Sequence, residues 1–171
     1  LALEHGAACN TAGGSHHAFA DGGAGFCVFN DVAVAARLLL AEGAIARVMV
    51  IDLDVHQGDG TARIFEADPR VFTLSVHCED NWPRRKAASD MDVGLPRGTG
   101  DAAYLAAVRD AVTEALEVSR PDLVFYNAGV DPHRDDRLGL LDLSDNGLAA
   151  REALVFDAVL KRGVPVTGVL G

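Results

Sequence analysis

Four stretches of this chain are largely apolar, and the first of them, residues 47–54, shows no polar alternation. Such runs are typical of β-strands that are buried on both faces, because a half-exposed strand alternates apolar and polar residues. β-Branched and apolar side chains dominate all four runs, which favours strand over loop. We therefore expect strands at residues 47–54, 71–76, 123–128 and 164–170.

Between the apolar runs, hydrophobic positions recur with the period of an α-helix. In the longest such stretch Leu105, Val108 and Val112 fall on one stripe, as they do in an amphipathic helix. Asn30 and Ser144 are residue types that cap helix N-termini, and glycines at the far ends of these stretches are typical helix stops. We expect helices at residues 30–42, 61–67, 101–118 and 144–162.

The alternation of strands and helices predicts an α/β fold, a parallel sheet with helices on both faces. Residues 77–100 are polar and rich in proline and glycine, and we expect a long loop there. Residues 1–9 resemble the tail of a helix, and the pattern stops at the end of a strand. We expect one domain over residues 1–171 that forms part of a larger fold, and exposed sheet edges would make an oligomer possible.

Charged residues follow two of the expected strands, where ligands bind in parallel sheets. Asp54 and His56 are spaced i, i+2, so on an extended strand they point to one side. Asp131 follows another strand, and all three converge if the two strands are neighbours. Two carboxylates and one imidazole suit zinc with an open fourth position. Aspartates also favour turns at strand ends, but the three residues together favour the metal.

Two adjacent histidines, His16 and His17, lie on a glycine-rich loop. Histidine titrates near neutral pH, so the pair could act as general acid and base. Each imidazole needs a partner that fixes its tautomer, and Asp52 and Asp59 are candidates. The alternatives are a solvated loop without a catalytic role and an adventitious metal site.

Composition narrows the classes of partner. The chain has 25 acidic against 15 Lys and Arg residues and a net charge of -10, which argues against direct binding of nucleic acid. No apolar run approaches the roughly 18 residues of a membrane span, and no signal peptide is visible. Cys9, Cys27 and Cys78 are too far apart for a metal pair, and an odd number suits a reducing compartment. We expect a cytoplasmic protein without a membrane partner.

Five sequence pieces, taken together, resemble the zinc-dependent histone deacetylase family. The closest resemblance is to its bacterial and class IV-like members, relatives of acetylpolyamine amidohydrolases and acetoin-utilisation deacetylases. The resemblance covers nearly the whole chain in family order, and it implies an arginase-like fold. The pieces are GGSHHAF (13–19), GFCVFNDV (25–32), VIDLDVHQGDG (50–60), SDMDVGLPRGTGD (89–101) and YNAGVDPHRDDRLG (126–139).

The resemblance implies roles for individual residues. His17 would be the main general base and acid, with His16 as the second histidine of the dyad. Asp52 would stand behind His16 and Asp59 behind His17. The implied zinc ligands are Asp54, His56 and Asp131. A potassium ion would lie beside the zinc, at Asp52, Asp54, His56, Ser75 and Val76, and a second such ion near Phe65 and Val71. An acyl-lysine tunnel would be lined by Gly25, Phe26 and, as a looser match, Trp82.

The family also places a catalytic tyrosine after a glycine run and an acidic residue near the tunnel rim. Neither position falls within residues 1–171, and Tyr104 and Tyr126 do not match the tyrosine. The function expected for the complete protein is hydrolysis of an acetyl-amide, of the acetyl-lysine or acetylpolyamine type, by metal-activated water and a His-Asp dyad. This piece by itself is expected to be a poor catalyst.

Two alternatives remain open. The first is an arginase-like ureohydrolase, which would need a two-manganese site with more Asp and His ligands, and the chain has only six histidines. The second is a domain that binds acyl-lysine or a partner protein without turnover.

Overall fold

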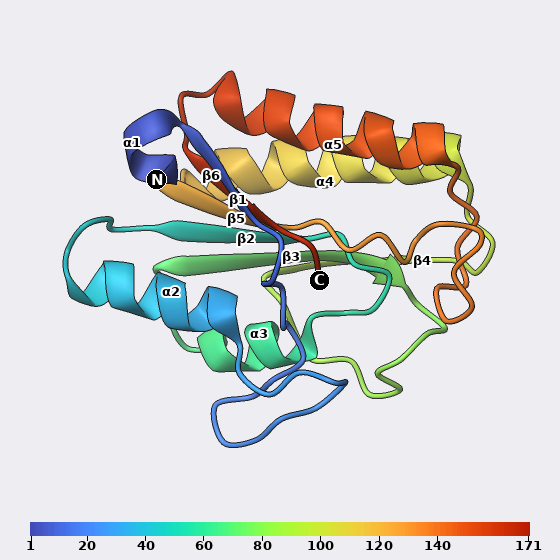
Figure 1. Ribbon diagram of the computed structural model, residues 1–171, viewed down its shortest axis with the longest axis horizontal. Helices are drawn as coiled ribbons and strands as arrows, with labels where there is room; N and C mark the ends of the chain where they lie inside the picture. Colours follow the sequence, from blue (N-terminus) through green and yellow to red (C-terminus); the bar gives the residue numbers. More distant parts are fainter.

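A six-stranded sheet forms the centre of the protein, and the computed structural model describes all residues from 1 to 171. The strand order is β1-β6-β5-β2-β3-β4, and every neighbouring pair is parallel. The predicted α/β class with a parallel sheet is therefore confirmed (Figure 1). The strands are β1 (Ala7–Asn10), β2 (Val48–Asp52), β3 (Val71–Cys78), β4 (Met91–Leu95), β5 (Leu123–Asn127) and β6 (Val166–Val169).

Helices cover both faces of this sheet, as the alternation predicts. Figure 1 shows α4 and α5 on one side of the sheet and α2 and α3 on the other, while the short α1 lies near the β1 edge. None of these helices is long and apolar enough to cross a bilayer. The helices are α1 (Ala2–His5), α2 (Asp31–Ala41), α3 (Asp59–Phe65), α4 (Asp101–Ser119) and α5 (Asp145–Leu160).

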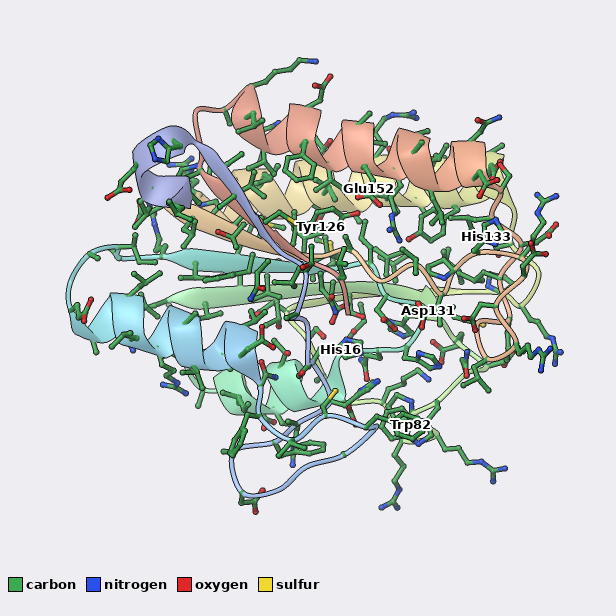
Figure 2. The ribbon with its side chains drawn as sticks, in the orientation of Figure 1. His16, Trp82, Tyr126, Asp131, His133 and Glu152 are labelled. Atoms are coloured by element: carbon green, nitrogen blue, oxygen red, sulfur yellow. The ribbon has the colours of Figure 1, made fainter.

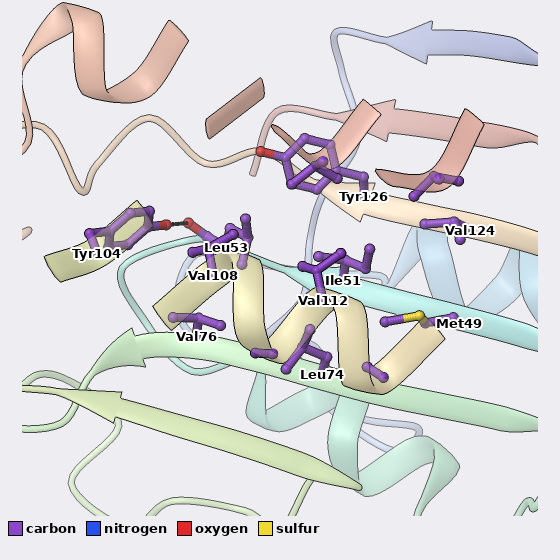
Figure 3. Packing of buried hydrophobic residues seen from close by; sticks show 14 of the residues in the cluster. Met49, Ile51, Leu53, Leu74, Val76, Tyr104, Val108, Val112, Val124 and Tyr126 are labelled. Atoms are coloured by element: carbon purple, nitrogen blue, oxygen red, sulfur yellow. Dashed lines mark hydrogen bonds between the residues drawn. The ribbon is translucent and has the colours of Figure 1, made fainter. Parts of the chain in front are cut away.

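The pleat of β2 divides the core into two layers. Met49 and Ile51 pack with Val108 and Val112 of α4 (Figure 3). The alternate residues of β2 face the opposite side and pack against α2 and α3. Every residue of β2 is buried, which explains why its sequence shows no polar alternation.

Helix starts agree with the capping chemistry of the sequence. The side chain of Asn30 accepts a hydrogen bond from Ala33 N at 2.9 Å, and that of Ser144 accepts one from Gly147 N at 3.1 Å. The helix expected at residues 61–67 is α3, which starts two residues earlier, at Asp59, with Gly58 as its N-cap.

Two expectations are wrong in part. Residues 1–9 hold only a four-residue helix, and β1 follows it as an edge strand paired with β6. The expected loop at residues 77–100 contains β4, which pairs with β3 at the other edge. Both missed strands are short and largely exposed on at least one face, so they lack the continuous apolar run that marks a strand buried on both faces.

The order of the strands positions the site. The chain runs outward from β2 through β3 to β4, then returns to place β5 on the other side of β2. At the carboxyl ends of this central pair, Asp52 lies directly opposite Asn127. Such a reversal leaves a crevice at the carboxyl ends of the strands, which is where ligands bind in open α/β sheets.

Candidate metal centre

Three side chains that can bind a metal converge just beyond the ends of β2 and β5. The ligand atoms of Asp54, His56 and Asp131 all lie within 4.8 Å of one another. The Nδ1 atom of His56 is 2.9 Å from Asp131 Oδ2 and 3.1 Å from Asp54 Oδ1. The backbone N–H of Val55 donates to Asp131 Oδ1 at 2.8 Å, which ties the two strand ends together. The structure thus brings the three predicted ligands into one group.

The local geometry differs from the expected extended strand. Strand β2 ends at Asp52, so Asp54 and His56 lie in the turn that follows it. Within that turn the backbone N–H of His56 donates to Asp54 Oδ1 at 2.8 Å. Side chain and backbone therefore turn His56 back toward Asp54, and the two meet without the alternation of a strand.

The electrostatics of the group fit a cation. Burial raises the pKa of Asp131, and the charge of Asp54 adds to this effect. Burial opposes a charge on His56, yet its contacts with Asp131 and Asp54 raise its pKa to about 10. The two neighbouring carboxylates therefore favour a positive charge beside them. Protonated His56 provides that charge in the metal-free protein, and a bound divalent ion could provide it instead. The donor set suits zinc, and three protein ligands leave a position open, as in catalytic zinc sites.

His16 sits directly beside this group and hydrogen-bonds an aspartate behind it. Its Nδ1 is 2.7 Å from Asp52 Oδ2, and both side chains are buried. Its Nε2 is 3.8 Å from Asp54 Oδ1. Burial opposes protonation, but Asp52 and Asp54 raise the pKa of His16 to about 9. His16 is therefore a cation at neutral pH when the triad holds no ion.

His17 also hydrogen-bonds an aspartate, but unlike His16 it is neutral. Its Nδ1 is 2.8 Å from Asp59 Oδ1, at the first residue of α3. Burial lowers the pKa of His17 below its usual 6.5, and the bond to Asp59 only partly offsets that. His17 is thus neutral at pH 7, with Nδ1 turned to Asp59 and Nε2 left to exchange a proton.

One cavity of about 830 Å³ opens onto the triad and both histidines. Figure 2 shows His16 and Asp131 near the strand ends and Trp82 below them. The cavity is large enough to hold a small organic ligand or an extended side chain. Its lining includes His16, His17, Gly25, Phe26, Asp54, His56, Trp82 and Asp131.

The three residues expected at a tunnel line this cavity in different ways. The ring of Trp82 stands edge-on to that of His17, with centroids 4.3 Å apart. A Cβ at Gly25 would come within 2.5 Å of His17 Cδ2, so only glycine fits there. Phe26 is fully exposed at the cavity wall, and its backbone has a φ of 64°, which is uncommon for a bulky residue.

The residues implied for the two potassium sites lie in two separate places. Asp52 of β2 lies opposite Ser75 of β3 in the strand register, and Val76 follows, so these positions adjoin the triad. Phe65 of α3 and Val71 of β3 belong to the core layer that faces α2.

Two buried polar residues were not predicted as part of the site. Gln57 follows His56, and its amide bonds Ala87 N, Ala87 O and Asp92 Oδ1 at 2.8–2.9 Å, which fixes the long loop. Arg151 of α5 is completely buried behind the triad. Both look like ordinary surface residues in the sequence, because nothing local indicates that they are enclosed.

The fold and site together define a class: a parallel α/β sheet with an Asp-His-Asp group and a buried histidine pair at its central crevice. The family described as "Histone deacetylase domain" matches residues 2–171. The chain therefore belongs to the histone deacetylase family.

Three similar proteins extend this result. An uncharacterised protein of Picosynechococcus sp. is 54% identical over the whole chain, which covers 57% of that relative. Histone deacetylase 2 of Arabidopsis thaliana is 37% identical over 97% of the chain and 44% of the relative. The crystal structure of acetylpolyamine aminohydrolase from Burkholderia pseudomallei superposes with a TM-score of 0.83 at 29% identity, covering 99% of this chain and 52% of that one. The chain thus spans about half the length of the relatives it matches.

Proposed function

We propose that the protein containing this chain is a zinc-dependent deacetylase that hydrolyses an acetyl-amide of the acetyl-lysine or acetylpolyamine type. The observation that carries the proposal is one cavity onto which the Asp54–His56–Asp131 group and the His16–His17 pair both open. The names of the similar proteins, histone deacetylase and acetylpolyamine aminohydrolase, support both substrate types.

Asp54, His56 and Asp131 would hold the zinc ion. When bound, zinc supplies a Lewis acid for the amide carbonyl and lowers the pKa of water. The two carboxylates bring negative charge that partly neutralises the ion, and Val55 N fixes one oxygen of Asp131.

His17 would take a proton from the attacking water and return it to the leaving amine. Its lowered pKa leaves it neutral at pH 7, which is the form that can accept a proton. Asp59 holds Nδ1 and would stabilise the imidazolium once it forms. His16, held at Nδ1 by Asp52, would be available to hydrogen-bond near the developing oxyanion.

The cavity wall would select a substrate whose acetylated amine is carried on a slim, unbranched chain. Trp82 and Phe26 offer aromatic faces, and Gly25 keeps the wall beside His17 free of a side chain. A straight methylene chain, as in acetyl-lysine or an acetylpolyamine, fits such a wall better than a branched one. We include potassium in the proposal, held near Asp52, Ser75 and Val76.

This chain's own tyrosines supply no phenol to the reaction. The hydroxyl of Tyr104 donates to Leu53 O at 3.4 Å, and that of Tyr126 donates to Glu152 at 2.6 Å. Neither residue lines the cavity. Burial raises the pKa of Tyr104 to about 12, so it stays a neutral donor.

The experiment is release of acetate by the full-length protein from an acetyl-lysine peptide and from an acetylpolyamine. We expect release that a chelator abolishes and that is lost in His17→Ala. Binding of an acetyl-lysine peptide without any release would instead support a non-catalytic domain, and release of urea from arginine with two metal ions per chain would support a ureohydrolase.

A further inference from the structure

A buried arginine contacts the backbone of the metal centre and does not line the cavity. Arg151 belongs to α5 and has no solvent exposure. Its Nη1 donates to Leu53 O at 3.1 Å and to Gly129 O at 2.8 Å, and its Nη2 donates to Ala128 O at 3.2 Å. One guanidinium therefore holds three backbone carbonyls that come from two different strand ends.

Those carbonyls belong to the turns that carry the proposed metal ligands. Leu53 immediately precedes Asp54, and Gly129 lies two residues before Asp131. Gly129 also packs so close to Asp54 that a Cβ there would be 2.3 Å from its Oδ2. Any shift of one turn relative to the other would change the spacing between Asp54 and Asp131.

The guanidinium is itself held in place. Glu152 Oε1 accepts from Arg151 Nε at 3.0 Å and also from Nη2, and Tyr126 donates to the other carboxylate oxygen at 2.6 Å. Figure 2 shows Tyr126 and Glu152 on the α5 side of the sheet, with Asp131 at the strand ends. A buried charge is costly unless it is paired, and here Glu152 supplies the pair.

We propose that Arg151 is a positioning residue for the metal centre: it fixes the turns after β2 and β5 at the spacing that one ion needs. This rests on the metal centre of the proposed function. The planar guanidinium donates in several fixed directions, whereas a lysine ammonium is a point charge on a flexible stem. Arg151→Lys should therefore keep the charge and lose the fixed spacing.

The test measures zinc affinity of the full-length protein by competition with a coloured chelator, and the visible spectrum of the cobalt-substituted protein. We expect Arg151→Lys and Arg151→Met to weaken zinc binding about 10- to 100-fold, the range found when residues that orient metal ligands are removed. The cobalt spectrum should change in both variants, because the ligands no longer share one fixed geometry. Circular dichroism identifies the variants that are folded.

Val159→Ala is the matched control, since Val159 is fully buried in the same helix, eight residues after Arg151, and its apolar side chain can donate no hydrogen bond to either turn. It should lower stability and leave zinc affinity and the cobalt spectrum unchanged. If a folded Arg151 variant binds zinc as tightly as wild type, or if Val159→Ala weakens binding equally, the positioning role is wrong. Zinc binding without acetate release would overturn the proposed function and leave this inference standing, whereas a wild-type protein that binds no zinc would overturn both.

Discussion

Asp131 joins the two halves of the proposed metal centre, because it follows β5 while the other two ligands follow β2. Its Oδ2 contacts His56 and its Oδ1 accepts from Val55 N. Asp131→Asn keeps the shape and the hydrogen bond but removes the negative charge. Chelator competition measures the zinc affinity, and we expect it to fall by roughly 100-fold or more. Loss of a residue that only orients a metal ligand can already cost about 100-fold.

The control is Asp135→Asn in the same loop, since Asp135 is exposed and lies outside the group of three ligands. Zinc affinity of this variant should equal that of wild type. Unchanged affinity in Asp131→Asn would show that Asp131 is no ligand.

The two adjacent histidines should titrate far apart. In the metal-free protein we expect His16 to titrate at about 9, because Asp52 and Asp54 outweigh its burial. His17 should titrate below 6.5, because burial outweighs Asp59. Ring ¹⁵N NMR over the pH range measures both, and His17→Ala assigns the signals.

Asp59→Asn should lower the pKa of His17 further, since it removes the negative charge that favours the imidazolium. A shift in the alkaline direction, or a wild-type His17 that titrates above His16, would contradict this charge assignment.

At the residue level, the sequence predicted the polar groups that follow apolar strands and missed those enclosed by distant segments. Asp54, His56 and Asp131 stand out because charge rarely follows directly on a buried strand. Arg151 does not, since its three carbonyl partners lie 22 to 98 residues away along the chain. Its burial depends on how α5 docks, which no local pattern shows.

Between elements, Gln57 connects the turn after β2 to the long loop before β4. It is completely buried, and it bonds both Ala87 and Asp92. Gln57→Leu keeps the size of the side chain and removes its three hydrogen bonds to the loop. We expect the free energy of unfolding, as measured in urea, to fall by about 1–3 kcal/mol, because each hydrogen bond contributes a net ~0.5–1.5 kcal/mol.

The comparison variant is Glu66→Gln, which removes an exposed pair with Arg63. Surface changes of this kind usually alter stability by less than about 0.5 kcal/mol. If Gln57→Leu costs no more than Glu66→Gln, the amide does not brace the loop.

Helices and central strands could be predicted because their signals are local. The caps Asn30 and Ser144 are where the sequence indicates, and β2 and β5 coincide with apolar runs. The edge strand β4 was missed although Met91, Val93 and Leu95 do alternate with polar or small residues. This short pattern lies within a polar, glycine-rich segment and does not stand out there. The pairing of β4 also depends on β3 and on the loop that Gln57 holds.

For the whole molecule, strand order is the property that makes the site. The alternation of elements predicts a parallel sheet with ligands at the carboxyl ends, and this is where the cavity opens. It does not predict that β5 returns to pair with β2, since any right-handed connection to either edge would satisfy the same pattern. That pairing brings Asp131 to Asp54, and it results from the packing of both core layers.

The central claim is that one ion binds to Asp54, His56 and Asp131. The most direct measurement is an anomalous difference map at the zinc absorption edge, from crystals of the zinc-loaded full-length protein. We predict one peak bonded to all three side chains, at about 2.0–2.2 Å from their ligand atoms. No peak at this group, or two peaks about 3.5–4 Å apart as in two-metal hydrolases, would contradict the account.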